Sequence, residues 1–359
     1  MSMLFAAAAV LSQPTLADDE PAGSKERVRG IEPVGLLQIW GTAYDWDTNA
    51  QADATSYGDP EHDPGVSVKR ARLGVEGREK GVTYELVFGL TAPYDAFDAE
   101  DGDIEVVDAT VGYRAGGAEK GLVGGEIGKS KLPFSRDQMM SSAELTFTER
   151  GLGAEHAAPD RALGLSAFGA KFGGKLTLGV FNSGGTLFGD DNVGKTLVGR
   201  LEYEKGDSYV TFRRKHGFAM GVGAGAYLTE DVATTTNALG ADALVRVAGV
   251  AVLADFSLQT ITPTATTVDE PGVLAETTRT TFTGQLSYGL GDFEPAVRYT
   301  MLMDSATGAW SQLLAGVVWH GVYKEDDDDR VRVGAGYVHR FEEVERSNDT
   351  VRVWAQMRL

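Results

Sequence analysis

The sequence predicts an all-β protein, a transmembrane antiparallel β-barrel of about 16 strands. Apolar and polar residues alternate along most of the chain with a period of two, which is the pattern of a β-strand. Short and long connections between these segments follow one another in order. After the N-terminal residues, no stretch approaches the ~20 apolar residues of a membrane helix. Only helices and closed barrels can span lipid, so a membrane location would require the barrel.

The alternating segments are the predicted strands. Residues 106–114, 293–303 and 350–359 each place Val, Ala, Tyr, Met or Leu on one face and mainly polar residues on the other. The segment from Ser208 is too long for one plain strand, so we expect a bulge or a small hairpin in it. The predicted strands begin near Leu36, Val66, Val82, Ile104, Gly121, Ala162, Lys175, Thr196, Ser208, Asn237, Val250, Arg279, Phe293, Ala309, Arg330 and Thr350.

The connections alternate between short turns and longer polar loops. This order places the turns at one end and the loops at the other, which is the plan of an outer-membrane barrel. A soluble β-sandwich also alternates, with its apolar face inward, so a soluble secreted β-rich binding protein or enzyme stays an alternative. Repeated Arg on the polar face favours the barrel. The longer connections are 47–65, 93–103, 131–161, 184–195, 228–236, 262–278, 304–308 and 342–349.

The N-terminal residues have the order of a secretory signal. An apolar run, "MLFAAAAVLS", is followed by small residues in "TLA" and then by the charged "DDE". We therefore expect a signal peptide at 1–17, an N-terminal periplasmic segment at 18–35 and the barrel at 36–359.

Composition excludes several classes of function. Lys and Arg total 33 and Asp and Glu total 52, which gives a formal net charge of −19. No nucleic-acid partner is expected, because duplex affinity depends on basic residues that neutralise phosphate. The chain has no Cys, which excludes disulfides and Cys metal sites. The motif "GDDNVGKT" at 189–196 matches a P-loop, but a strand-like segment follows it where a P-loop needs a helix. We expect no catalytic residue, metal site or cofactor.

Arginines recur on the polar faces of the predicted strands. If that face lines a pore, their guanidinium groups meet water and passing anions, which Arg binds well through its planar fork. The alternative is that they pair with Glu and Asp on the same face, such as Glu85 and Asp242, and leave little net field. The predicted pore-lining residues are Arg70, Arg72, Arg114, Arg200, Arg246, Arg298, Arg330, Arg332 and Arg352.

The connection 131–161 is the longest one between clear strands, and loops of that length are usually functional. Around it, "VKRARLGVEG", "GEIGKSKLPFSRDQMMSSAELTFTERGL" and "APDRALGLSAFG" resemble the phosphate-selective porin O and P family over roughly 68–169. The matching residues are Gly128, Lys131, Pro133, Phe134, Ser141, Ser142, Thr146, Phe147, Glu149, Arg150, Ala158, Pro159, Arg161 and Gly164.

The resemblance implies a porin of the bacterial outer membrane, usually a homotrimer, surrounded by outer-membrane lipid and lipopolysaccharide. Small hydrophilic solutes or ions, including anions such as phosphate, would diffuse through a water-filled pore. The loop after strand 5 would fold inward and narrow it. The acidic composition departs from the concentrated basic path of phosphate-selective members. A structural or adhesive barrel with a closed lumen is the first alternative. The predicted constriction residues are Lys129, Lys131, Arg136, Arg150 and Arg161.

This reading predicts that replacing Lys129, Lys131, Arg136 and Arg150 by Ala shifts ion selectivity toward cations, because fixed charge acts most strongly where a pore is narrow. The reversal potential across a planar bilayer measures the shift. Unchanged selectivity in an open, folded pore would contradict the assignment of the loop.

Overall fold

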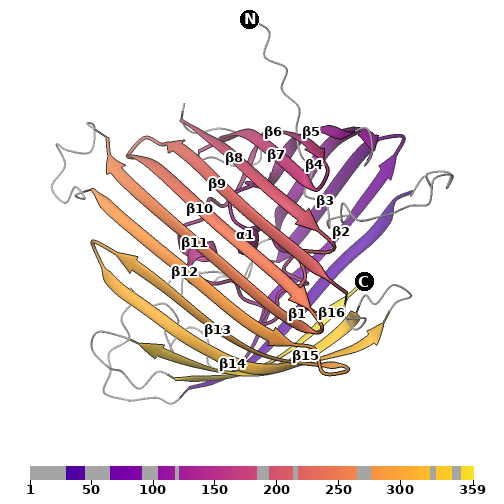
Figure 1. Cartoon of the computed structure of the whole chain (residues 1–359), viewed down its shortest axis with the longest axis vertical. Helices are drawn as coiled ribbons and strands as arrows, with labels where there is room; N and C mark the ends of the chain where they lie inside the picture. Colours follow the sequence, from indigo (N-terminus) through magenta and orange to yellow (C-terminus); the bar gives the residue numbers. More distant parts are fainter. Residues whose placement is uncertain are drawn as a thin grey trace, which may run out of the picture.

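The computed structural model describes residues 30–44, 65–90, 104–117, 121–183, 194–212, 217–264, 276–323, 329–341 and 349–359. Within these ranges, sixteen antiparallel strands close into one barrel, in which each strand pairs with its neighbours in sequence and β1 pairs with β16 (Figure 1). The predicted fold class is confirmed. No helix in the described part of the chain is long and apolar enough to cross a membrane.

The strands differ in length from 9 to 16 residues. Their bounds are β1 (Glu32–Tyr44), β2 (Gly65–Glu79), β3 (Val82–Leu90), β4 (Ile104–Gly117), β5 (Gly121–Lys131), β6 (Arg161–Lys171), β7 (Gly174–Asn182), β8 (Lys195–Lys205), β9 (Ala219–Glu230), β10 (Thr234–Val247), β11 (Val250–Pro263), β12 (Thr277–Tyr288), β13 (Phe293–Asp304), β14 (Gly308–Tyr323), β15 (Asp329–Phe341) and β16 (Thr350–Arg358).

The period-two pattern has a direct structural cause, because successive side chains of a strand point to opposite faces. In β16, Val351, Val353 and Met357 are about half exposed on the outside, whereas Trp354 and Gln356 between them are buried. A soluble protein would bury the apolar set. Outward apolar residues and inward polar residues are the arrangement that lipid outside and water inside require.

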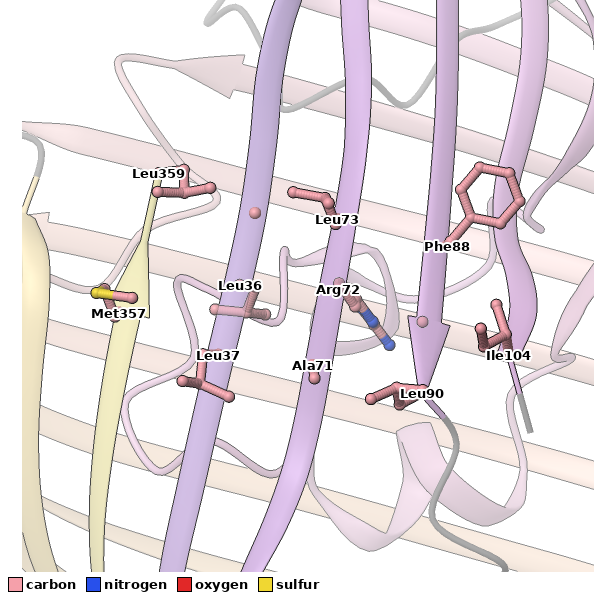
Figure 2. A pocket seen from close by; sticks show the side chains of 12 residues that line it. Leu36, Leu37, Ala71, Arg72, Leu73, Phe88, Leu90, Ile104, Met357 and Leu359 are labelled. Atoms are coloured by element: carbon pink, nitrogen blue, oxygen red, sulfur yellow. The ribbon is translucent and has the colours of Figure 1, made fainter. Parts of the chain in front are cut away.

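A shallow apolar groove of about 290 Å³ lies on the outer face, where β16, β1, β2, β3 and β4 adjoin (Figure 2). Leu73, Phe88, Leu90 and Met357 line it and are well exposed. The groove therefore belongs mainly to the apolar exterior of the barrel.

The starts of β1 and β9 differ most from the prediction. The first strand begins at Glu32, before the expected start at residue 36, and pairs with Glu76 of β2 from its first residue. The ninth strand is present, but its predicted start at Ser208 is wrong, since β9 begins at Ala219. The predicted signal peptide and most of the predicted periplasmic segment lie outside the described residues, as do most residues of the P-loop match. Residues 195–205 after that match form β8, so the expected strand is confirmed.

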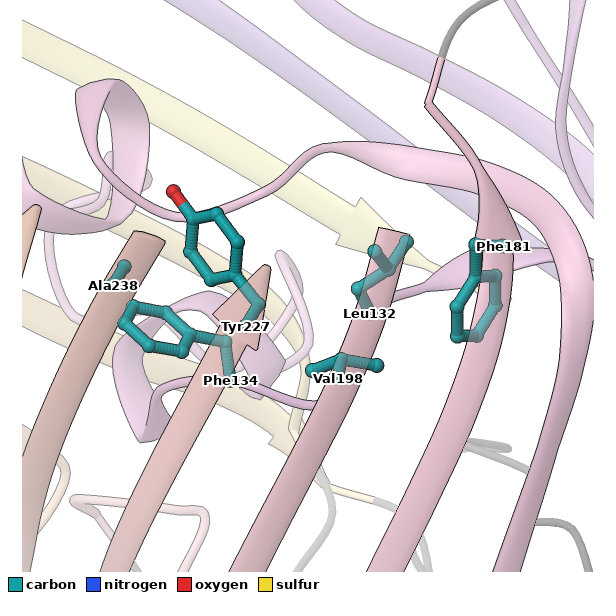
Figure 3. Packing of buried hydrophobic residues seen from close by; sticks show 6 residues of the cluster. All are labelled: Leu132, Phe134, Phe181, Val198, Tyr227 and Ala238. Atoms are coloured by element: carbon teal, nitrogen blue, oxygen red, sulfur yellow. The ribbon is translucent and has the colours of Figure 1, made fainter. Parts of the chain in front are cut away.

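The connection between β5 and β6 carries two short helices, α1 (Arg136–Met139) and α2 (Leu152–His156). Figure 1 shows α1 within the ring of strands. Leu132 and Phe134, at the start of this connection, pack against Phe181, Val198 and Tyr227 on the inner faces of β7, β8 and β9 (Figure 3). The ring centroids of Phe134 and Tyr227 lie 4.9 Å apart in an edge-on arrangement. The segment Leu132–Asp160 is called the constriction loop below.

Glycines on the inner face of β9 make room for the constriction loop. A Cβ atom at Gly225 would lie 2.2 Å from the carbonyl oxygen of Phe134, and one at Gly221 would lie 2.7 Å from the guanidinium of Arg136. The loop can therefore rest against the wall only because these positions have no side chain.

Gly225→Val should displace the constriction loop from β9, because the new side chain meets backbone that cannot move aside cheaply; overpacking of this kind costs about 1–3 kcal/mol. We expect a lower midpoint of thermal unfolding, measured by circular dichroism, and a changed single-channel conductance. The matched control is Ala226→Val on the outer face of the same strand, where the side chain is exposed. Equal effects of the two variants would contradict the close packing at Gly225.

Candidate pore constriction

The entry of the constriction loop is clamped to the wall by a buried ion-pair network. Arg136, fully buried, places Nε 3.0 Å from Oδ1 of Asp242, and its backbone N–H donates to Oδ2 of the same residue. Arg200 of β8 also binds Asp242, with NH1 2.6 Å from Oδ2, and donates to the carbonyl oxygen of Phe134. Glu204 lies 3.4 Å from Arg136. One carboxylate of β10 thus joins the loop and the wall.

The rest of the loop is held by polar side chains from several strands. The backbone N–H of Asp137 donates to Asp255 of β11, and that of Leu152 donates to Thr300 of β13 at 2.9 Å. A carboxylate oxygen of Asp137 accepts the backbone N–H of Gly151 at 2.6 Å and ties the two halves of the loop together. The loop is therefore fixed at both ends and along the wall.

Strands β1 and β16, which close the barrel, also hold the loop. Gln38 donates to the carbonyl oxygen of Ser142 at 3.0 Å, and Trp40 donates to the hydroxyl of Thr148 at 3.0 Å. Arg352 forms an ion pair with Glu149 of the loop and lies 3.8 Å over the ring of Trp40. The loop is therefore held by strands on both sides of the barrel, since β1 and β16 are far from β10 in the sheet.

Burial of charged side chains differs between the two sides of the lumen. Most inward charges on β8–β13 are buried, with half-buried Arg279 as an exception. The buried ones are Arg200, Glu202, Glu204, Asp242, Arg246, Asp255, Glu294, Arg298 and Asp304. Those on β2–β4 are half-buried: Arg70, Arg72, Glu76, Arg78, Glu85, Asp108 and Arg114. Because the loop covers the first side, the solvated part of the lumen lies along β2–β4.

Basic side chains gather where the loop faces this solvated side. Arg70 donates to the carbonyl oxygen of Thr148, and Arg72 lies 3.3 Å from the hydroxyl of Ser142. Lys131 places Nζ 2.7 Å from the carbonyl oxygen of Met140. These three cations with Arg150 and Arg161 are called the basic cluster: Arg70, Arg72, Lys131, Arg150 and Arg161.

Two members of the basic cluster are oriented by the loop and the wall. Arg150 donates through NH2 to the carbonyl oxygen of Met140 at 2.7 Å. Burial and then the charge of Arg70 lower the pKa of Arg150 to about 10, so it stays cationic at neutral pH. Arg161 binds Asp108 through two hydrogen bonds, of 2.9 and 3.1 Å, and so has part of its charge offset.

The predicted site residues fall into three groups. Lys131, Arg150, Arg161, Arg70 and Arg72 come together in the basic cluster. Arg136 lies in the loop as expected but is fully buried among carboxylates and meets no solute path. Lys129 lies on the same face of β5 as Ile127, whose side chain is 62% exposed on the outside. Its placement in the constriction is wrong, because strand alternation turns it away from the lumen.

Most of the predicted pore-lining arginines anchor the loop or its surroundings. Arg200, Arg246, Arg298, Arg332 and Arg352 are buried. Arg298 donates to the carbonyl oxygen of Glu149 at 2.7 Å, and Arg332 places NH2 3.1 Å from Glu144 of the loop. The alternative, in which these arginines pair with Asp or Glu inside the barrel, describes Arg200, Arg332 and Arg352. Arg114 is half-buried on the solvated side, and Arg330 is exposed at the start of β15.

The sequence analysis named Asp242 as a partner of the polar-face arginines, but it did not predict the contacts with the loop or with Tyr209. Asp242, Glu202 and Tyr209 are buried beside the loop, and the hydroxyl of Tyr209 donates to Glu202 at 2.5 Å. Asp242 and Glu202 occupy inward positions in the alternation, so the pattern gave their face. The pattern did not predict that Asp242 binds Arg136 of the loop or that Tyr209 binds Glu202.

A closed sixteen-stranded barrel with a long loop folded into a polar lumen defines the porin class of outer-membrane protein, which places the chain in the bacterial outer membrane. Residues 41–215 match the family model of phosphate-selective porin O and P, which confirms the predicted family resemblance. The family and the fold point to a channel rather than an enzyme. A search of curated proteins gave no match.

Solved structures with the same fold cover nearly the whole chain. The anion-selective porin from Comamonas acidovorans superposes with a TM-score of 0.62 at 14% identity, over 92% of this chain and 100% of that one. OmpT of Vibrio cholerae, in its trimer form, gives 0.59 at 12%, over 92% and 100%. The outer-membrane channel DcaP of Acinetobacter baumannii gives 0.54 at 9%, over 93% and 99%. At these identities the likeness establishes the fold.

The basic cluster predicts a contrast between two single substitutions. Arg72→Gln should lower the chloride-to-potassium permeability ratio, by about twofold, because it removes a half-exposed charge from the narrow zone. Lys129→Gln removes the same charge from the outer face of β5 and should leave the ratio unchanged. Reversal potentials of both purified proteins in one KCl gradient provide the comparison. A larger effect from Lys129 would contradict the placement of the two residues.

Proposed function

We propose that the protein is a porin that lets small hydrophilic solutes, with a preference for anions such as phosphate, diffuse passively past the basic cluster. The observation that carries the proposal is the position of this cluster between the constriction loop and the half-buried inner face of β2–β4. A solute in the solvated part of the lumen passes these cations where the channel is narrowest. Passive diffusion needs no catalytic residue, and none is assigned.

Charge at the constriction is proposed to outweigh the acidic composition of the whole chain. Field lines concentrate in a narrow passage with low-dielectric walls, whereas charges on distant loops are screened by salt within about 10 Å. An Arg guanidinium binds an oxyanion through two parallel N–H donors. The basic cluster would therefore bind phosphate more strongly than chloride. Glu76 and Glu85, on β2 and β3, lie at inward positions closer to the short-turn ends of their strands and would oppose tight retention of the anion.

The assembly and surroundings are part of the same proposal. The Vibrio cholerae structure is a trimer form, and the apolar outer face of the barrel suits both a homotrimer and contact with outer-membrane lipid and lipopolysaccharide. Cross-linking in mild detergent tests the trimer separately from conduction.

A structural barrel with a closed lumen is the second candidate. It is favoured by the dense filling of the β8–β13 side, where inward polar groups such as Thr281, Thr283 and Gln285 are buried against the loop. This candidate predicts folded protein that inserts into bilayers without stepwise conductance.

The reversal potential of the purified protein under a KCl gradient tests the proposed function. We expect a chloride-favouring potential and a chloride current that millimolar phosphate reduces, because oxyanions compete for the basic cluster. A potassium-favouring potential would overturn the anion preference and leave a porin for other solutes. Absence of channels from correctly folded protein would favour the structural barrel.

A further inference from the structure

The connection between β8 and β9 is unusual for its end of the barrel. The neighbouring turns on that end, such as Phe172–Gly173 and Ala248–Gly249, are two residues long, whereas this connection runs from residue 206 to residue 218. Its residues Ser208–Phe212, called the inward turn below, are almost fully buried, with exposed fractions between 2% and 5%. A short-end turn in contact with water alone would not be buried in this way.

Successive residues of the inward turn contact strands that lie farther and farther from β8. Tyr209 donates its hydroxyl to Glu202 of β8. The carbonyl oxygen of Val210 accepts from Arg246 of β10 at 2.6 Å. Phe212 stacks on His320 of β14, with ring centroids 3.7 Å apart and planes at 12°. Since β9–β13 separate β8 from β14 in the sheet, the turn crosses the interior of the barrel.

The inward turn also supports the constriction loop from below. Arg136 donates through NH1 to the carbonyl oxygen of Ser208 at 2.9 Å, and its guanidinium lies 4.5 Å from the ring centre of Tyr209. The hydroxyl of Thr211 lies 3.0 Å from that of Thr146 in the loop. Tyr209 packs with Met139, Met140 and Leu145 of the loop and with two leucines of the wall, Leu244 and Leu253.

His320, on which Phe212 stacks, is held in place by two carboxylates. His320 is fully buried, with Nδ1 2.6 Å from Asp329 and Nε2 3.2 Å from Glu294. Glu294 also lies within hydrogen-bonding distance of Thr146 in the loop, at 3.4 Å. The far end of the turn and the underside of the loop therefore meet at one polar cluster.

We propose that the inward turn is a second constriction element, which enters from the end opposite the loop, closes the lumen beneath it and fixes its position. The loop enters at the end of β5 and the inward turn at the end of β8, and antiparallel order places these two ends on opposite sides of the barrel. Permeation is then confined to the solvated side along β2–β4. Tyr209 and Phe212 act as positioning residues and do not themselves contact the solute.

A disulfide cross-link tests the docking without relying on conduction. The chain has no Cys, so Thr146→Cys with Thr211→Cys introduces a single pair at positions whose side chains touch. Oxidised glutathione should close the disulfide in folded, detergent-extracted protein, and the product runs as a compact band on a non-reducing gel. The pair Thr146→Cys with Phe218→Cys is the control, since Phe218 is half exposed at the other end of the connection. Equal or faster closure in the control pair would overturn the docking.

Single-channel conductance tests the role of the turn, and this reading rests on the proposed porin function. Phe212→Ala and Tyr209→Ala should each raise conductance, by about twofold, because the lumen under the loop opens. Tyr209→Phe keeps the ring under Arg136 and should stay near the parent value, and Phe218→Ala should not change it. Arg72→Gln should alter selectivity with little effect on conductance, which separates the two elements.

The outcomes distinguish the two proposals. A closed disulfide with unchanged conductance in Phe212→Ala and Tyr209→Ala would overturn the second constriction and leave the porin intact. A closed disulfide in a protein that forms no channels would overturn the porin function alone. Retention of the folded form on unheated gels ensures that each variant is compared as a complete barrel.

Discussion

The ion pairs that Asp242 makes with Arg136 and Arg200 are the interaction on which the pore depends. Both guanidinium groups are buried, and a buried charge is tolerated only when it is paired and hydrogen-bonded. Removing one partner of a buried pair typically costs roughly 3–5 kcal/mol, because the other charge is stranded. A single carboxylate therefore fixes the loop, the wall of β8 and β10 and, through Arg136, the inward turn.

A polar lumen makes such anchoring possible. In a soluble protein the loop would be held by an apolar core, and here the apolar residues are required on the outside by lipid. Three small apolar clusters, around Phe134, Met140 and Phe147, do join the loop to the wall. Hydrogen bonds to inward Gln, Thr, Arg and Asp side chains hold the rest of the loop. Several arginines of the polar faces hold the loop in place, and the half-buried cations near β2–β4 are the ones left on the solvated side of the lumen.

The barrel could be predicted from the sequence because its main signal is local. Outward Val353 and inward Arg352 differ by one position, and a period of two needs no knowledge of the partner strand. The same alternation places Lys129 outside with Ile127. It fails at the end of β5, where Lys131 has the same parity but turns inward to a carbonyl oxygen of the loop. Pairing of lumen arginines with carboxylates was one of the two expectations, but the contact of Arg136 with Asp242 and Tyr209 was not predictable, since it forms only after the barrel closes.

The wrong start of the ninth strand shows why the path of the inward turn could not be predicted from the sequence. Residues 208–212 alternate in a way that suits a strand, and Val210 and Phe212 have high strand propensity. Two constraints compete for them. If these residues formed a strand, Tyr209 or Phe212 would lie in lipid, which is favourable for an aromatic ring. Arg136, Arg246 and His320 would then lack the contacts that the turn supplies. As an inward turn they bury the same aromatic rings against these groups and satisfy both. The inward turn is favoured over the strand by its buried polar partners across the lumen. No local pattern in the sequence encodes these partners.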